Sequence, residues 1–376
     1  MATRPNEIYL DWNATTPPHP DVLSAMQAAR ADAWGNPASV HGAGRRARAV
    51  LDDARALVAE FLARDARDVL FTSGGTEANN LALAGAPAIV TSRLEHPSVT
   101  RVAEAREAEG GTVRWLPVGA LGRIEPDAVE GALAGVPEGA VVAVGAVNHE
   151  TGVIQPIGAI AEVTARARGR FHVDAVQAAG RVSPELWRFG DTVAVAAHKL
   201  RGPKGIGALG VRPGLVPSPV LLGGSQERGL RPGTVDAVAA AGFAAAVRRA
   251  DEGVIRYAAL ATLRDAIERA FAGVARVNGA SAPRAPHVTS LAFAQRRGDE
   301  LAAALDLDGV RASSGSACTA GTSEPSAVIA AMHGRERALG TLRVSLGEAT
   351  TADEVSEFIR ILGGVLARPA DASGAG

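Results

Sequence analysis

Lysine is almost absent from this chain. Lysine and arginine together number 39 in 376 residues, yet Lys199 and Lys204 are the only lysines. Arginine meets every other need for positive charge, but its guanidinium stays protonated and cannot form an imine. An amine that loses its proton to become a Schiff-base nucleophile has to be lysine. The lysine pair, in a Gly/Pro-rich turn after an apolar run, therefore predicts a chemical requirement at this turn. A compositional bias that happened to spare two lysines is the alternative.

Cysteine is scarce as well. With Cys318 as the single cysteine, the chain can form no internal disulfide, and no Cys/His cluster has the spacing of a zinc site, so no metal is predicted. The first residues lack the apolar core of a signal peptide. The longest apolar run, Ala237–Val247, is too short to span a bilayer. We expect a cytoplasmic protein without membrane attachment.

The chain also lacks a marked excess of positive or negative charge. The net charge is −1, and acidic residues are interspersed among the arginines, so no basic face indicates nucleic-acid binding. The chain is 47% hydrophobic and 21% charged, as is usual for a globular protein. Its length is enough for two domains with a large core.

Short β-rich runs alternate with Ala/Arg/Glu-rich stretches of helical spacing. This alternation predicts an α/β fold with a mostly parallel seven-stranded sheet covered by helices on both faces. The last run follows its predecessor after about ten residues, too few for a helical crossover, so we expect it to be antiparallel. The predicted strands are Val69–Thr72, Ala88–Ser92, Val113–Pro117, Val141–Ala146, Arg170–Val173, Thr192–Ala196 and Gly207–Arg212.

The pattern changes after Gly253, where a long predicted helix (Ile255–Phe271) leads to scattered strands and helices typical of a smaller α+β domain. We therefore expect a large domain over residues 16–254. Residues 1–15 and 255–367 would form the small domain, which carries the segment around Cys318. Residues 368–376, rich in Pro, Ser and Gly, are expected to be a disordered tail.

Polar residues follow several of the predicted strands. In open α/β sheets, ligands bind beyond the carboxyl ends of the strands, which is where these residues fall. Each alone has an ordinary explanation: a Gly-Gly-Thr turn, a histidine in a loop, or an aspartate that caps a helix. Together they supply what pyridoxal phosphate needs: an anion nest, a carboxylate for the ring nitrogen, an imidazole and an imine-forming lysine. The residues are Gly74-Gly75-Thr76, His96, Asn148, Asp174 and His198-Lys199.

Several motifs resemble those of the cysteine desulfurases, which belong to the class V aminotransferase-like, fold-type I pyridoxal phosphate enzymes. The resemblance spans essentially the whole chain and includes the lysine turn. It implies the fold-type I architecture, a homodimer with shared active sites, and L-cysteine as substrate. The other motifs run over residues 9–17, 35–39, 71–77, 171–177, 231–234 and 313–318.

The resemblance also implies a role for each matching residue. Lys199 would hold the cofactor covalently and later move the substrate proton, and His96 would stack on the ring and assist proton transfer. Asp174 would pair with the ring nitrogen and Gln177 with the ring hydroxyl. The phosphate would be held by Gly75, Thr76, His198 and, from the partner subunit, Thr234. The substrate would be bound by Asn148, Arg343 and Asn36.

Arg343 is a weak candidate without the resemblance. It lies on an alternating predicted strand whose other face carries Leu342, Val344 and Leu346, so a solvated face at a sheet edge is the ordinary interpretation. Arginine does suit a substrate carboxylate, because its fork contacts both oxygens at once.

Cys318 lies among small, polar and glycine residues with no apolar periodicity. A lone cysteine is more often a small buried hydrophobe. This setting instead favours a mobile thiolate that carries sulfur from a substrate to an acceptor. The expected product is a persulfide on Cys318 together with alanine. The sulfur would pass to an acceptor protein, either an iron–sulfur scaffold or a thiolation enzyme.

One position departs from the family pattern. Ala196 stands where family members commonly carry a serine whose hydroxyl meets the phosphate, so cofactor affinity is expected to be lower unless another donor substitutes. Two other functions remain open. One is a different lyase or aminotransferase on the same cofactor, such as a selenocysteine lyase, and the other is a non-catalytic sulfur-relay scaffold.

Overall fold

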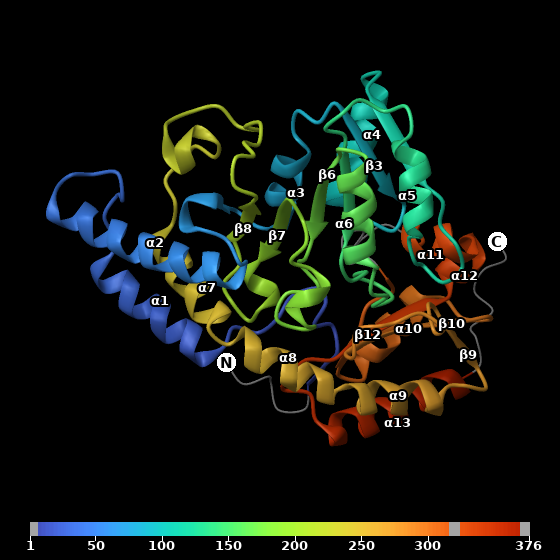
Figure 1. The fold of residues 1–376 in the computed structure, drawn as a ribbon. Helices are drawn as coiled ribbons and strands as arrows, with labels where there is room; N and C mark the ends of the chain where they lie inside the picture. The colour runs from blue at the N-terminus through green and yellow to red at the C-terminus, as the bar shows by residue number, and fades with distance from the viewer. Residues whose placement is uncertain (1–6, 316–323, 369–376) are drawn as a thin grey trace.

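The computed structural model describes residues 7–315 and 324–368. A seven-stranded sheet forms its centre, with strand order β2-β8-β7-β6-β5-β3-β4. The sheet lies between layers of helices in Figure 1. Its strands are β2 (Val69–Thr72), β3 (Ala88–Ser92), β4 (Thr112–Leu116), β5 (Val141–Gly145), β6 (Arg170–Asp174), β7 (Thr192–Ala196) and β8 (Gly207–Val211).

The sheet is mostly parallel, as predicted. Strands β4, β3, β5, β6 and β7 pair in parallel, whereas β8 runs antiparallel to both β7 and β2. The short β7–β8 connection cannot hold a helical crossover, so β8 has to run back along β7. Strands such as β5 and β7 read as continuous apolar runs because both of their faces are covered.

Helices cover both faces of this sheet. Apolar side chains of α2 (Gly42–Phe61), α5 (Pro126–Leu133), α6 (Ile157–Arg166) and α7 (Ala237–Val247) share the main hydrophobic cluster with one face of the sheet. Those of α3 (Gly75–Leu83) and α4 (Pro97–Ala108) pack on the other face. Helix α1 (Pro20–Asp32) packs on α7 rather than on the sheet.

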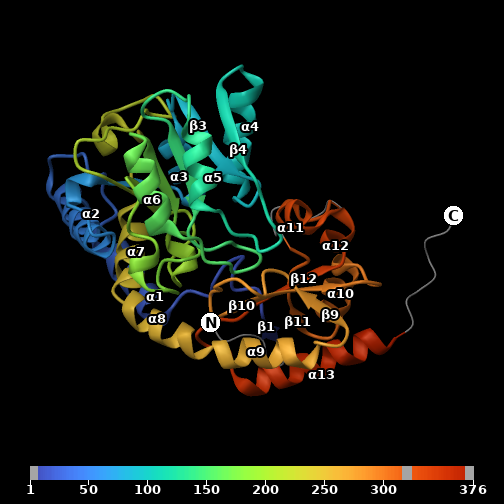
Figure 2. The same ribbon diagram turned by 45° about the vertical axis from the view of Figure 1, so that its right-hand side comes forward.

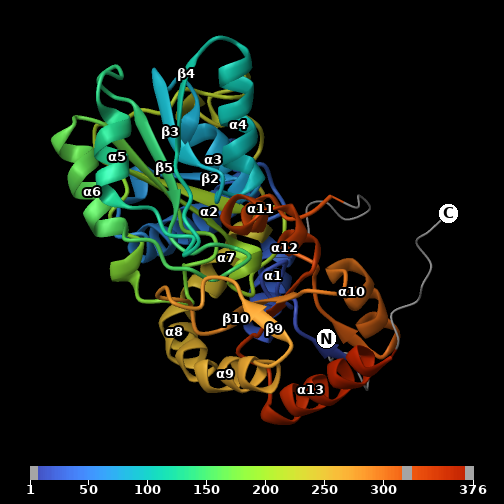
Figure 3. The same cartoon turned by 90° about the vertical axis from the view of Figure 1, so that its right-hand side faces the viewer.

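A second hydrophobic cluster lies around a three-stranded antiparallel sheet with strand order β12-β10-β9. Figures 2 and 3 place this sheet beside helices from the last third of the chain. Strand β1 (Ile8–Tyr9) pairs in parallel with β11 (Val310–Arg311), so the beginning of the described chain lies with this later region. The remaining elements are α8 (Ala250–Ala259), α9 (Ala261–Ala270), β9 (Ala275–Val277), β10 (Val288–Phe293), α10 (Gly298–Leu307), α11 (Ala327–His333), α12 (Arg335–Leu339), β12 (Thr341–Ser345) and α13 (Ala352–Ala367).

Two details differ from the sequence prediction. The single helix expected over Ile255–Phe271 is the pair α8 and α9, which meet at Leu260. Leu260 keeps helical backbone angles. The sequence beside it contains neither glycine nor proline, so it gives no sign of the break. Helix α1 was not predicted, because it buries only Val22 and Ala29 and its apolar periodicity is correspondingly weak. Within residues 7–315 and 324–368, no helix has both the length and the apolar character needed to cross a membrane.

Candidate active site

Lys199 ends a 3-10 turn (Ala197–Lys199) that directly follows β7. The chain therefore presents this lysine at the carboxyl edge of the sheet, where neighbouring parallel strands also end. Its Nζ donates hydrogen bonds to the backbone carbonyls of Asn13 and Ala14, the latter at 2.8 Å. The N-terminal segment thus lies directly against the lysine, although it is 185 residues away in the chain.

A cavity of about 240 Å³ opens beside Lys199. Its walls come from the ends of several strands of the central sheet and from the first turns of α3 and α4. The structure therefore brings most of the predicted site residues together. Those that line the cavity are Gly75, Thr76, His96, Asn148, Asp174, Gln177, His198 and Lys199.

Asp174 ends β6 and uses both carboxylate oxygens as acceptors. Oδ1 accepts from the backbone N–H of Val176 at 3.0 Å, and Oδ2 accepts from Asn79 Nδ2 at 2.7 Å. The Asn79 amide also donates to Ser98, so its oxygen, 2.9 Å from His172 Nε2, is left to accept from this ring. Burial lowers the pKa of His172 to about 4, so the ring is neutral. A buried chain of neutral groups therefore orients the Asp174 carboxylate.

Helix α3 begins at the cavity with Gly75 and Thr76. Gly74 precedes it with a φ of 157°, and no side chain caps its first turn. A Cβ on Gly75 would lie 2.7 Å from Cγ2 of Val176, so only glycine lets the backbone sit here. The first backbone N–H groups of a helix have no partner within the helix and form a site for an anion.

Three histidines lie around the cavity. His96 caps α4, with Nδ1 accepting from the Ser98 N–H at 3.1 Å, and its ring meets the His149 ring edge-on at 5.5 Å. Burial lowers the pKa of His96 and lowers that of His149 much further. Burial and the charges of Lys199, Arg181 and Lys204 lower the pKa of His198 to about 3. Neutral imidazoles can accept a proton from a bound substrate.

Glu95 also lines the cavity and was not predicted from the sequence. Its carboxyl group accepts from Ser92 Oγ at 2.8 Å and from the Gly145 N–H at 2.6 Å. Burial raises the pKa of Glu95 to about 7, although these two hydrogen bonds oppose the shift. Glu95 directly precedes His96 in the sequence, and this proximity to a predicted site residue is the signal that could have identified it.

Two predicted substrate-binding residues are engaged within the protein. Asn148 Nδ2 donates to the Leu94 carbonyl at 2.9 Å, and its Oδ1 accepts from the N–H groups of Glu150 and Thr151. Arg343 pairs with Asp11 at 2.7 Å and is 2% exposed, so the interpretation as a solvated face is wrong. The chain beside β1 covers this side of β12, which the alternation of residues within β12 could not reveal.

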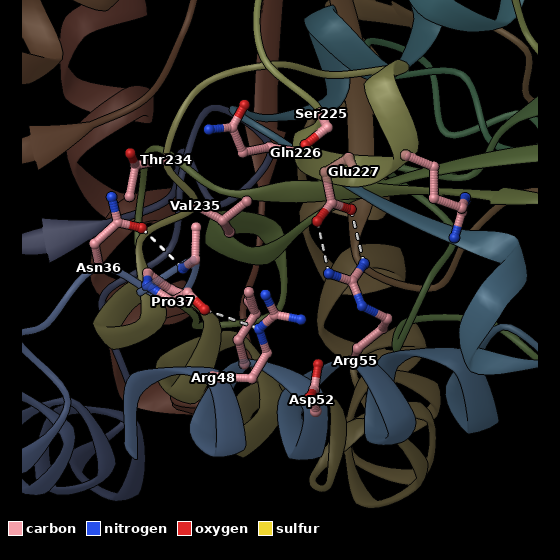
Figure 4. Close-up of a pocket in the computed structure, with 13 residues that line it drawn as sticks. Asn36, Pro37, Arg48, Asp52, Arg55, Ser225, Gln226, Glu227, Thr234 and Val235 are labelled. Carbon is pink, nitrogen blue, oxygen red and sulfur yellow. Dashed lines mark hydrogen bonds and ion pairs between the residues drawn. The ribbon is translucent and has the colours of Figure 1, made fainter. Parts of the chain in front are cut away.

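Thr234 and Asn36 do not join the other predicted residues. They line a different cavity of about 360 Å³, drawn in Figure 4. Both are exposed. In this cavity Arg55 and Glu227 form a two-pronged ion pair with N–O distances of 2.7 and 2.6 Å. Cys318 lies outside the described residues.

The residues around Lys199 fit pyridoxal phosphate. An amine, a carboxylate with neutral partners, the uncapped N-terminus of α3 and a neutral imidazole surround one cavity. These groups match the aldehyde, the ring nitrogen, the phosphate and the ring face of this cofactor. Ala196 lines the cavity close to Gly75, where a serine hydroxyl is common in the family.

The fold and this site define a pyridoxal phosphate enzyme, and comparisons with known proteins agree. The chain matches the family described as aminotransferase class-V over residues 8–358. It is 39% identical to a cysteine desulfurase of Cereibacter sphaeroides over 94% of both chains. It is 38% identical to an IscS-like cysteine desulfurase of Mycobacterium tuberculosis over 96% of both. The structure of a NifS-like protein from Rickettsia africae superposes with a TM-score of 0.87 at 28% identity, covering 96% of this chain and 99% of that one.

The chain therefore belongs to the class-V aminotransferase family and, within it, to the cysteine desulfurases. This membership confirms the predicted family, the enzyme class and the cofactor. The predicted fold is confirmed by the structure and by its similarity to the NifS-like protein.

Proposed function

We propose that this cysteine desulfurase takes sulfur from L-cysteine, releases L-alanine and carries the sulfur as a persulfide on Cys318. The observation that carries the proposal is the meeting of Lys199, Asp174, His96 and the start of α3 around one cavity. Pyridoxal phosphate, when bound, supplies a ring that withdraws electrons from the substrate's α-carbon.

The chain's own residues divide the work around this cofactor. The Lys199 amine would hold the cofactor and move the α-proton of the substrate. The Asp174 carboxylate, fixed by Asn79, would pair with the ring nitrogen and favour its protonated form. His96 would accept a proton as a neutral imidazole, and Gln177 would bind the ring hydroxyl. Gly75, Thr76 and His198 would hold the phosphate.

Sulfur transfer balances without an added oxidant. The Cβ–S bond of the substrate breaks with its electron pair staying on carbon, where a proton replaces the sulfur to give alanine. The Sγ of Cys318, as thiolate, forms the new S–S bond to the released sulfur atom. The sulfur then passes to a protein acceptor, an iron–sulfur scaffold or a thiolation enzyme. The thiolate is the reactive form, because a thiol is a poor nucleophile.

We also propose that the enzyme is a homodimer in which Thr234 reaches the phosphate of the partner subunit. The supporting observation is that Thr234 and Asn36 are exposed and line a cavity other than that of Lys199. Arg343 and Asn148 are proposed to bind the substrate carboxylate with Asn36. Among residues 7–315 and 324–368, the Nε of Arg343 has no hydrogen-bond partner, which supports this role.

A division of the chain into residues 16–254 and a small domain built from residues 1–15 and 255–367 is supported by the two hydrophobic clusters. The pairing of β1 with β11 supports the assignment of the first residues to the small domain. A cytoplasmic location is proposed from the single cysteine, which suits a reducing compartment.

Mass spectrometry of the purified enzyme after addition of cysteine tests the sulfur chemistry. We expect alanine in the solution and one additional sulfur atom on the peptide that contains Cys318. Because Cys318 is the only cysteine, no other residue can carry a persulfide. Release of sulfide at the wild-type rate by Cys318→Ala would contradict the persulfide step and favour a different lyase.

A further inference from the structure

Arg181 is a charged side chain that is only 1% exposed. Its Nη1 donates to Asn13 Oδ1 at 2.8 Å and to Gln177 Oε1 at 2.6 Å. Its Nη2 donates to the backbone carbonyls of Trp12 and Lys199, each at 3.1 Å. All four acceptors are neutral oxygens, so none of these contacts neutralises the guanidinium.

These contacts join three segments that are far apart in the chain. They are the N-terminal strand region at Trp12 and Asn13, the turn after β6 at Gln177, and the turn that carries Lys199. Asn13 connects them a second time, because its backbone carbonyl accepts from both Lys199 Nζ and Gln177 Nε2. Both the backbone and the amine of Lys199 are therefore held by the same group of residues.

The charge of Arg181 acts at short range on the lysine turn. Arginine stays protonated even when buried. In a protein interior its field on a neighbouring amine is much stronger than in water. The effect already appears at His198, whose pKa is lowered by burial, by Lys199 and by Arg181.

Other ionisable groups also surround the Lys199 amine and belong in the charge balance. His96, His149 and His198 are neutral rings, and Asp174 and Glu95 lie on the same cavity wall. Lys204 follows in the same turn, and Arg343, paired with Asp11, lies beyond His149. Removal of Arg181 alone leaves all of these groups in place.

We propose that Arg181 is a positioning residue for Lys199: its fork fixes the lysine turn against Asn13 and Gln177, and its charge favours the neutral, nucleophilic form of the Lys199 amine. A positive charge next to an amine opposes a second positive charge on that amine. The proposal rests on the proposed function, in which Lys199 forms the covalent link to the cofactor.

Competitive acylation tests the proposal on the full chain without cofactor. Trace acetic anhydride is added across neutral to alkaline pH, and acetylation of the Lys199 and Lys204 peptides is measured by mass spectrometry. Lys204 is exposed and serves as the internal reference, and no other lysine contributes signal. We expect Lys199 to titrate at a clearly lower pH than Lys204. Titration of Lys199 at or above the pH of Lys204 would overturn the proposal without any variant.

Two variants separate charge from geometry. Arg181→Met removes the charge and keeps most of the volume. We expect the Lys199 titration to move to higher pH, with about a tenfold lower acylation rate relative to Lys204 below both pKa values. Arg181→Lys keeps the charge and loses the fork. Here the Lys199 titration should stay close to wild type, while pyridoxal phosphate binds more weakly by fluorescence titration. Circular dichroism verifies folding.

An unchanged Lys199 titration in a folded Arg181→Met protein would refute the role of the charge. Wild-type cofactor affinity in Arg181→Lys would refute the role of the fork. The acylation result is obtained without cofactor, and the affinity result compares Arg181→Lys with a wild-type protein that binds pyridoxal phosphate. Failure of the proposed function is distinct from both, because it would appear as a wild-type protein that never forms a coloured complex with pyridoxal phosphate.

Discussion

Two cavities in the described part of this chain treat charge in opposite ways. Around Lys199, in about 240 Å³, Asp174 accepts from an amide and a backbone N–H, and Lys199 donates to backbone carbonyls. In the larger cavity of about 360 Å³, Arg55 and Glu227 neutralise each other directly. Charged groups that hydrogen-bond only to neutral partners can still bind a charged ligand. The charges of an ion pair neutralise each other, so the pair stabilises the fold instead. Chemistry rather than size therefore distinguishes the active site.

The largest effect on activity is expected from substitution of Lys199. Lys199→Arg keeps the positive charge but removes the imine-forming amine, so we expect turnover of cysteine to fall by roughly 10³-fold or more. Lys204→Arg is the matched control in the same turn and should keep near wild-type activity. Alanine formation and the visible absorbance of the bound cofactor measure both. Comparable losses in the two variants would show that the turn, rather than the Lys199 amine, is required.

Substitutions at the ion pair of the second cavity should change the free energy of unfolding. The Arg55 side chain is 15% exposed and the Glu227 side chain 3%, and Glu227 holds a left-handed φ of 45° beside the pair. Arg55→Met leaves a buried carboxylate without its partner, at a cost of about 3–5 kcal/mol in the free energy of unfolding. Urea denaturation measures this loss.

Arg48→Met is the control in the same cavity. Arg48 is exposed and donates to the Pro37 carbonyl, so the change should stay within about 0.5 kcal/mol. A loss as large as that of Arg55→Met would mean that the ion pair is not what stabilises this region.

A smaller effect is expected at Ala196, on the wall of the Lys199 cavity. Ala196→Ser adds a hydroxyl that can donate to the cofactor phosphate. A hydrogen bond to a charged group is worth about 1.5–3 kcal/mol, so cofactor affinity should rise about tenfold or more. Fluorescence titration of the apoenzyme measures it. Ala197→Ser, one residue on and in the hydrophobic core, should give no such gain.

A further effect concerns the pH dependence of stability at Glu95. Its pKa of about 7 lies above the usual 4.5, so between these values the folded chain keeps a proton that the unfolded chain releases. Its contribution to stability is therefore full at low pH and is lost as pH rises through this window. Glu95→Gln should make the free energy of unfolding fall less steeply with pH. The change in slope corresponds to at most one proton, or about 1.4 kcal/mol for each unit of pH. The free energy of unfolding, measured from acid to neutral pH, tests this prediction, with Glu109→Gln at an exposed position as the control. Identical slopes in the wild type and Glu95→Gln would contradict the raised pKa.

The sequence predicted the parts of the fold that local pattern determines. Strands buried on both faces, such as β5, read as continuous apolar runs, and the short connection made β8 antiparallel. The break at Leu260 has no such signal, because the residue keeps helical backbone angles and is neither glycine nor proline.

The site divides in the same way. Asp174 ends β6 and Lys199 lies just after β7, which pairs with β6 in parallel, so their meeting at one sheet edge follows from the topology. Arg181 and Glu95 acquire their roles only through tertiary contacts, with Asn13 for the former and Gly145 for the latter. Likewise, the burial of Arg343 depends on the separate segment around Asp11. No local pattern records which distant segment will cover a side chain.

We propose that the Lys199 amine forms the covalent link to pyridoxal phosphate. Reduction of the coloured enzyme with borohydride, followed by proteolysis and mass spectrometry of the two lysine peptides, tests it directly. We expect a reduced pyridoxal adduct on the Lys199 peptide and an unmodified Lys204 peptide. An adduct on Lys204, or a protein that stays colourless after addition of pyridoxal phosphate, would contradict it.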